Sequence, residues 1–204
     1  ASSASTASAS KSPPASTAGS SCKAMEGVFE AFVDAADSQG RRFVLIGGHA
    51  INAHGYERTT LDFDFLVLGS DHEEWKKIMA SLGYSPIHET AAFIQFAPEA
   101  GGPTRIDLML VSDPTFEKLY LASDSKIYGG KSMRVASVLH LIALKLHATR
   151  SWNRAVEGKD YYDIFNLIRI HRIDTNSEDF QQILSRYATE SIRERLLSDL
   201  KRLA

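Results

Sequence analysis

Apolar residues in the first half of the chain follow two different spacings. Between residues 23 and 38 they recur every three or four positions, which predicts an amphipathic helix. Residues 43–46 form a continuous apolar run ended by two glycines, a pattern typical of a strand buried on both faces. Similar patterns predict a short helix over residues 49–54, strands over 61–68, 92–97 and 104–111, and a helix over 71–82.

The second half of the chain carries helical periodicity throughout. Four helices are predicted over residues 135–150, 159–171, 177–187 and 191–203. Residues 1–22 are mostly Ser, Ala, Thr and Pro, so they have almost no large side chain to bury and are predicted to be a disordered tail, a linker or an expression remnant. We therefore expect an α+β (α/β-like) protein, with a small mixed-sheet core over 23–134 and a helical region over 135–204 packed on it.

Three aspartates stand on the polar faces of two predicted strands. Successive side chains of a strand point to opposite faces, so Asp62 and Asp64 share one face while Leu61 and Phe63 share the other. The same alternation in the strand over 104–111 sets Asp107 opposite its apolar neighbours. If the two strands are neighbours, the three carboxylates can converge.

Converging carboxylates repel each other unless a cation neutralises them or their pKa values rise. Oxygen ligands without nearby His or Cys suit Mg²⁺ or Mn²⁺. The alternative is that these acids are simply solvated on the exposed side of an antiparallel sheet. The preceding Gly47-Gly48 favours the metal, because glycines before a short helix let backbone amides approach phosphates. These features together predict a nucleotide site.

Composition narrows the class of protein further. The 23 Lys and Arg residues nearly balance the 25 Asp and Glu residues, so no strongly basic field indicates a nucleic-acid groove, although a local patch is compatible with this balance. Cys22 is the single cysteine, which excludes an internal disulfide and a cysteine metal site. No apolar run approaches the length of a membrane span. The sequence thus predicts a soluble, cytoplasmic protein without a membrane partner.

The order of these motifs resembles that of a known superfamily. The first motif of the polymerase-β-like nucleotidyltransferases is similar to Gly47-Gly48-His49 followed by Arg58, Thr60, Asp62 and Asp64. The later Lys145, Arg150, Lys159-Asp160 and Asp163 resemble the abortive-infection toxin-type (AbiEii-like) branch. The resemblance spans about residues 43–167. It implies a magnesium-dependent enzyme that transfers a nucleotidyl group from an NTP to a hydroxyl acceptor.

The resemblance also implies roles for individual residues. Nucleotide-binding roles fall on Gly47, Gly48, His49, Arg58, Thr60 and Lys145; metal-binding roles fall on Asp62 and Asp64, with Asp107 added from the strand pattern; Asp160 orders the active site. His49 departs from the superfamily, which usually has serine or threonine at or just after the second glycine. An imidazole can also donate a hydrogen bond to phosphate.

The helical half supports this interpretation independently. On a helical wheel Lys145 falls inside the apolar arc of its helix, and Asp160 and Asp163 point near the apolar side of the next helix. Either these charges face the active site, or Lys145 is an interfacial ion-pair partner of Asp160 or Asp163. His140 and His147 are predicted on the solvated face.

The hypothetical reaction is an attack by an acceptor hydroxyl on the α-phosphate. Asp62 and Asp64 would hold Mg²⁺ on the triphosphate, and Asp107 would bind a second ion and help to deprotonate the acceptor. Pyrophosphate would leave. The acceptor stays open between RNA such as tRNA, protein and a small molecule. Toxin-like relatives suggest a possible antitoxin partner. Two alternatives are a catalytically silent protein that binds nucleotide or a partner protein, and a metal-dependent hydrolase.

Overall fold

The computed structural model describes residues 18–150 and 158–202. Its centre is a seven-stranded mixed sheet with the strand order β3-β4-β5-β2-β1-β7-β6. The strands are β1 Phe43–Ile46, β2 Phe63–Leu68, β3 Tyr84–Thr90, β4 Phe93–Pro98, β5 Ile106–Val111, β6 Asp124–Tyr128 and β7 Lys131–Val135. The pairs β2–β5 and β1–β7 are parallel, whereas the other neighbours are antiparallel.

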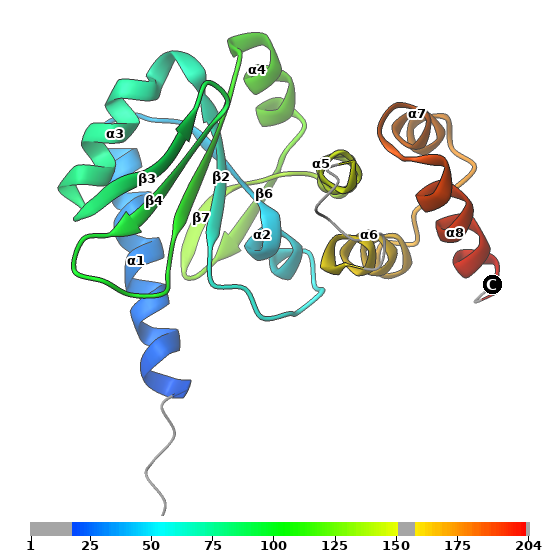
Figure 1. Ribbon diagram of the computed structural model, residues 1–204, viewed down its shortest axis with the longest axis horizontal. Helices are drawn as coiled ribbons and strands as arrows, with labels where there is room; N and C mark the ends of the chain where they lie inside the picture. Colours follow the sequence, from blue (N-terminus) through cyan, green and yellow to red (C-terminus); the bar gives the residue numbers. More distant parts are fainter. Residues whose placement is uncertain (1–17, 151–157, 203–204) are drawn as a thin grey trace, which may run out of the picture.

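Helices flank this sheet and then continue beyond it (Figure 1). They are α1 Ala18–Ser38, α2 Gly47–Ala53, α3 His72–Ser81, α4 Asp113–Leu121, α5 Val138–Thr149, α6 Lys159–Ile170, α7 Glu178–Tyr187 and α8 Glu190–Lys201, with a 3-10 turn η1 at Gly69–Asp71. Within the described residues, no helix is both long and apolar enough to cross a membrane.

One face of the sheet is covered by α1 and α3, which lie on the same side in Figure 1. The contact is largely aromatic. Phe32 of α1 stacks on Phe65 of β2 with ring centroids 4.0 Å apart, and on Trp75 of α3 at 5.5 Å. All three side chains are fully buried. Burying these large rings contributes much of the hydrophobic stabilisation of this half.

The opposite face of the sheet looks toward the helical half of the molecule (Figure 1). The helices α5 and α6 pack on each other, and their buried apolar side chains join those of α7 and α8 in one core. The helix α5 begins where the Ser137 side chain accepts a hydrogen bond from the His140 backbone amide. The expected α+β architecture with a C-terminal helical region is confirmed.

Several predicted boundaries differ from the structure. Helix α1 already begins at Ala18, inside the segment predicted to be disordered; residues 1–17 lie outside the described residues. Strand β2 starts only at Phe63, so Leu61 is 43% exposed and does not belong to an apolar face. The predicted last helix reached residue 203, also outside the described residues, while α8 ends at Lys201.

Four elements had no counterpart in the prediction. They are β3, α4, β6 and β7. The predicted helix over 135–150 in fact starts at Val138, because Val135 ends β7 and pairs with Leu45 of the parallel strand β1. The sheet therefore extends one hairpin further along the chain than periodicity alone indicated.

Candidate active site

The carboxylates predicted to converge lie on neighbouring strands. Strands β2 and β5 run parallel, and Asp64 is the register partner of Asp107. Asp62 lies one residue before β2, so it is next to the pair but outside the ladder. The expectation that the acid-bearing faces of the two strands meet is therefore confirmed, and the acids are on the side that looks toward α5.

The two glycines explain how Asp64 fits at the end of β1. Gly47 has φ +65°, and a Cβ built on it would lie only 1.9 Å from Oδ2 of Asp64. A Cβ on Gly48 would lie 2.5 Å from the Thr60 hydroxyl oxygen and 3.0 Å from a guanidinium nitrogen of Arg58. Any side chain at either position would displace these groups. The glycines thus admit a carboxylate on one side and Thr60 with Arg58 on the other.

The Gly48 amide has a different partner from the one predicted. Its N–H donates to the Asp64 carboxylate, whereas the sequence suggested that the glycine amides bind phosphates. The phosphate contact of the Gly48 amide stays a prediction, because a phosphate would compete with this carboxylate for the same donor. The bond instead holds Asp64 in place at the sheet edge.

Two acids of this site have raised pKa values. Burial, aided by the neighbouring Asp107 and Asp62, raises the pKa of Asp64 to about 6, although Lys145 and the Gly48 amide oppose the shift. Burial and Asp62 also raise the pKa of Asp107, against the hydrogen bond from Gln95. Raised pKa values of neighbouring buried acids are typical of functional sites.

The donor set suits a hard divalent cation, although a complete ligand cage is not preformed. Among the described residues, no three His, Cys, Asp or Glu side chains already stand close enough to share one ion. Asp62 makes no hydrogen bond or ion pair within this part of the chain. Carboxylate oxygens that repel each other, two anchored and one free, fit Mg²⁺ or Mn²⁺ by chemistry.

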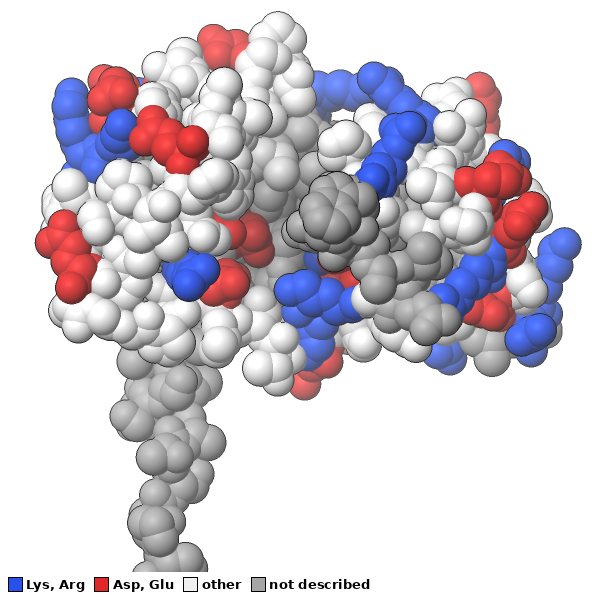
Figure 2. All heavy atoms as spheres, viewed as in Figure 1, with Lys and Arg blue, Asp and Glu red and all other residues white. Residues whose placement is uncertain are grey.

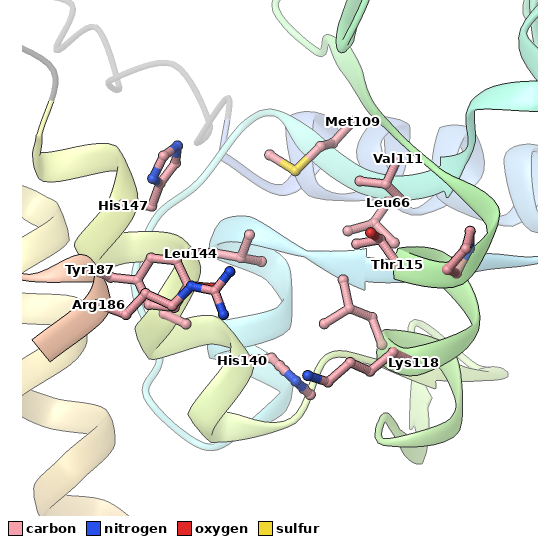
Figure 3. A pocket seen from close by; sticks show the side chains of 13 residues that line it. Leu66, Met109, Val111, Thr115, Lys118, His140, Leu144, His147, Arg186 and Tyr187 are labelled. Atoms are coloured by element: carbon pink, nitrogen blue, oxygen red, sulfur yellow. The ribbon is translucent and has the colours of Figure 1, made fainter. Parts of the chain in front are cut away.

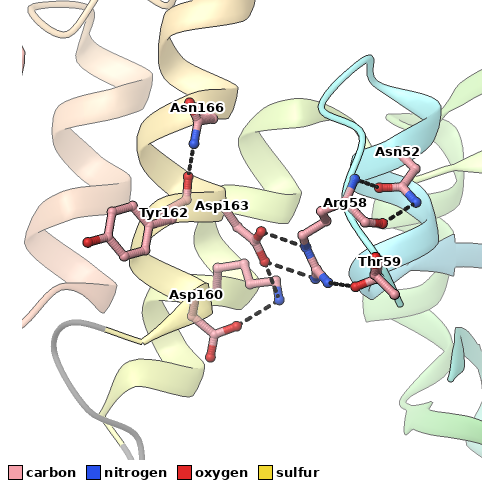
Figure 4. A network of polar contacts seen from close by, with 8 residues as sticks. Asn52, Arg58, Thr59, Asp160, Tyr162, Asp163 and Asn166 are labelled. Carbon is pink, nitrogen blue, oxygen red and sulfur yellow. Dashed lines mark hydrogen bonds and ion pairs between the residues drawn. The ribbon is translucent and has the colours of Figure 1, made fainter. Parts of the chain in front are cut away.

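A buried network of charges joins α5 and α6 to the loop before β2 (Figure 4). Lys145 Nζ lies 2.7 Å from Asp160 and 3.0 Å from Asp163. Arg58 reaches the same Asp163 through Nε at 2.7 Å and Nη2 at 3.0 Å. Asp163 is 1% exposed. The ion pair considered for Lys145 is therefore present with both aspartates.

This network does not remove Lys145 from the candidate active site. Its charge still lowers the pKa of Asp64, so the ammonium lies within electrostatic reach of the sheet acids. The backbone of Arg58 is held by the side chain of Asn52. The Arg58 amide donates to Asn52 Oδ1 at 3.0 Å, and the Arg58 carbonyl accepts from the Asn52 side-chain amide. Asp163 joins both cations and ties α6 to the loop before β2.

His49 points into the protein rather than into an open phosphate site. Its ring stacks on Phe63 with centroids 4.1 Å apart, and its Nδ1 lies 2.8 Å from the Tyr128 hydroxyl. The residue is 5% exposed. Burial, helped by the charge of Arg58, lowers the pKa of His49 to about 4. In this conformation the imidazole packs in the core, and the phosphate contact of His49 stays a prediction.

Gln95 and Arg105 were missed by the sequence interpretation. Gln95 pairs across β4 and β5 with Asp107, and its amide donates to both carboxylate oxygens at 3.0 and 3.2 Å. Arg105 Nη1 lies 3.4 Å from Gln95 Oε1. The one available signal was an amide in the middle of the otherwise apolar run over residues 92–97.

A cavity of about 530 Å³ continues from the acids along the same sheet face (Figure 3). Its floor contains Leu66 and Met109, each two residues beyond Asp64 or Asp107, which is about 7 Å along a strand. Its walls come from α4, α5 and α7. A cavity of this size is ordinary for a small-molecule site.

The rim of this cavity is cationic. Lys118 and Arg186 line it together with His140 and His147, and in the described chain neither Lys118 nor Arg186 is paired with an acid. Contrary to the prediction, His140 is half-buried; burial and the charge of Lys118 lower its pKa. Figure 2 shows acidic side chains on the sheet side of the hollow and Lys and Arg side chains on its opposite rim.

The fold defined by this sheet is shared by solved structures of nucleotidyltransferases and nucleotidyltransferase-like proteins. A solution structure of the antibiotic-resistance factor ANT(2'')-Ia matches with a TM-score of 0.64 and 15% identity, over 89% of this chain and 99% of that chain. The lincosamide antibiotic adenylyltransferase LnuA, solved with lincomycin, matches at 0.53 and 15% over 71% and 97%. An antigenic nucleotidyltransferase-like protein from Paracoccidioides brasiliensis matches at 0.53 and 16% over 86% and 92%.

The sequence itself places the chain in one family of this class. A profile of the family described as "Nucleotidyl transferase AbiEii toxin, Type IV TA system" matches residues 31–204, so the chain belongs to that family. A search of curated proteins found no match. The resemblance inferred from the sequence motifs is therefore confirmed at the level of the family.

Proposed function

We propose that this protein transfers a nucleoside monophosphate from an NTP to a hydroxyl group of an acceptor, with Asp62, Asp64 and Asp107 holding Mg²⁺ or Mn²⁺. The observation that carries the proposal is the in-register pairing of Asp64 with Asp107 beside Gly47. When bound, such a cation would neutralise the phosphate oxygens and stabilise the leaving pyrophosphate. The family match supports the same reaction class.

The residues of the chain have distinct tasks in this proposal. Lys145, 12% exposed at its side chain and within reach of Asp64, binds a phosphate oxygen while Asp160 and Asp163 orient it. Asp107 accepts the proton of the attacking hydroxyl. A bond forms between the acceptor oxygen and the α-phosphorus, and the bond to the pyrophosphate oxygen breaks. Arg58 shapes the site through Asp163.

The cavity beside the acids suits a substrate that carries negative charge. Its floor is apolar, and its rim holds two cations without acid partners in the described chain, Lys118 and Arg186. ANT(2'')-Ia has been solved with adenylyl-tobramycin, a derivative of a polyamine. The rim described above would repel such a polycation, so an RNA end or another anionic acceptor fits this chain better.

Labelled NTPs test the proposal directly. The full chain would be incubated with each α-labelled NTP, Mg²⁺ and a cell lysate, and the label followed into RNA, protein and small-molecule fractions. Wild-type protein should label one fraction, and Asp62→Asn with Asp64→Asn should label none. The exposed Asp37→Asn is the matched control, since it removes a carboxylate at the far end of α1. Persisting transfer in the double variant would refute the assignment.

A catalytically silent protein that binds nucleotide or a partner protein is the second candidate. Three observations favour it: His49 is buried, the Gly48 amide is already bound, and no three-acid cage is preformed among the described residues. Thermal shift with NTP and Mg²⁺ separates the enzyme from a silent protein that binds only a partner protein, because only a metal-dependent nucleotide site should gain stability that requires both together. A silent protein that binds nucleotide is distinguished by the absence of transfer in the labelling assay. Growth arrest on expression, lost in Asp64→Asn, would support a toxin that needs an antitoxin partner.

A further inference from the structure

The carboxylate of Asp107 has a dedicated donor on the neighbouring strand. Gln95 of β4 faces Asp107 of β5 as its register partner, and Nε2 lies 3.0 Å from Oδ1 and 3.2 Å from Oδ2. Both side chains are half-buried. A carboxylate offers about four lone-pair positions, so this contact leaves others free for a further ligand.

The surroundings of Gln95 select one orientation of its amide group. Arg105 can only donate, so the oxygen of Gln95 faces Arg105 Nη1, at 3.4 Å. Asp107 in its ionised form can only accept, so the nitrogen of Gln95 faces the carboxylate. The reversed amide would set oxygen against oxygen and nitrogen against nitrogen. Both neighbours therefore favour the same rotamer.

The three candidate metal ligands differ in how they are held. Asp64 accepts a hydrogen bond from the Gly48 amide, and Asp107 accepts from Gln95, whereas Asp62 has no polar partner in the described chain. The terminal torsion of an aspartate is broad, so a carboxylate without a partner samples many orientations. Two of the three acids are thus oriented in advance by the protein.

We infer that Gln95 is a positioning residue: its amide fixes the plane of the Asp107 carboxylate, so that Asp107 and Asp64 receive the divalent cation as a pre-oriented pair. This inference rests on the proposed function. Groups that hydrogen-bond a metal ligand typically change metal affinity or activity by about ten- to a hundredfold when they are removed. Gln95 itself touches neither substrate nor cation.

Binding of Mn²⁺ without nucleotide tests this role apart from catalysis. Gln95→Met keeps the length of the side chain and removes both donors. The Mn²⁺ dissociation constant, measured by electron paramagnetic resonance on the full chain, should rise about tenfold or more. In the transfer assay the Mg²⁺ concentration for half-maximal rate should rise similarly, while kcat at saturating Mg²⁺ changes less. Gln95→Ala should behave in the same way.

His88→Met provides the control. His88 is the register partner of Gln95 on β3, is exposed, and makes no contact with Asp107 in the described chain. This variant should bind Mn²⁺ like the wild type, and all variants should keep thermal midpoints close to it. A folded Gln95→Met protein with Mn²⁺ affinity within twofold of the wild type would overturn the inference.

Asp107→Asn separates this inference from the proposed function. If Asp107→Asn weakens Mn²⁺ binding and Gln95→Met does not, the positioning role fails and the metal assignment stands. If neither substitution alters Mn²⁺ binding, both fail together. If both weaken it and His88→Met does not, the inference is supported.

Discussion

The acid-bearing face of the sheet and the charge network around Asp163 arrange their charges in opposite ways. On the sheet, Asp64 and Asp107 are paired in register, and burial together with neighbouring carboxylates raises the pKa of each. Where the helical half meets the loop before β2, Lys145 pairs with Asp160 and Asp163, and Arg58 pairs with Asp163, so two cations and two acids neutralise each other. Like charges kept together at a cost are what the proposed divalent cation would stabilise. Opposite charges paired in the interior indicate a joint between parts of the fold.

The largest expected effect comes from removing charge on the sheet. Asp64→Asn should reduce nucleotidyl transfer by at least about a thousandfold, more than 4 kcal/mol in transition-state free energy. The same substitution should raise the thermal midpoint in metal-free buffer at neutral pH, since it removes an ionised carboxylate from a repulsive, buried position. The transfer assay measures the loss of activity, and calorimetry measures the change in the thermal midpoint. A lowered midpoint would contradict the contrast between the two sides.

The opposite outcome is expected on the helical side. Asp163→Asn leaves Arg58 and Lys145 without their shared acid, and breaking a buried ion pair costs about 3 to 5 kcal/mol. For a chain of this size each 1 kcal/mol corresponds to about 2 to 4 °C in the thermal midpoint. The exposed Glu99→Gln is the control and should be nearly neutral. A midpoint unchanged in Asp163→Asn would show that the network is not a structural joint.

The pH dependence of stability sharpens the same comparison. The pKa of Asp64 is raised from 3.8 to about 6. The contribution of its protonated form to the free energy of unfolding is therefore fully present below pH 3.8 and is lost as the pH rises through about 6. A shift of this size corresponds to about 3 kcal/mol at neutral pH. Chemical denaturation of the metal-free protein should therefore show that the free energy of unfolding falls between pH 4 and 7, and that it falls less in Asp64→Asn. Saturating Mg²⁺ should flatten the wild-type profile, and an equal slope in both proteins would speak against this pKa shift.

The smallest effect is expected at the cationic rim. Lys118→Met combined with Arg186→Met should raise the KM for an anionic substrate about three- to tenfold, because exposed charges contribute about 1 kcal/mol or less each. The value of kcat should change less, since neither side chain reaches the acids. Lys77→Met, an exposed lysine on α3 away from the cavity, is the control. Unchanged KM values would contradict the proposal that the cationic rim favours an anionic acceptor.

Local periodicity was sufficient for the outline of the site. Alternation along two strands set Asp62 and Asp64 on one face and Asp107 on a matching face, and the helical wheel turned Lys145 toward Asp160 and Asp163. Each inference depends only on the geometry of one element. The main helices of the C-terminal half followed for the same reason.

The tertiary structure decided which groups meet. Strand β7 pairs with β1 from about ninety residues away, so nothing local indicates it. The bond from Gln95 to Asp107 depends on the register of two strands, and Arg58 reaches Asp163 only because α6 packs beside the loop before β2. The His49 side chain points inward because it stacks on Phe63 and lies within hydrogen-bond distance of the Tyr128 hydroxyl. The sequence by itself determined which face of each element carries charge; the partner of each charge was decided by packing between distant segments, because that energy depends on the whole fold.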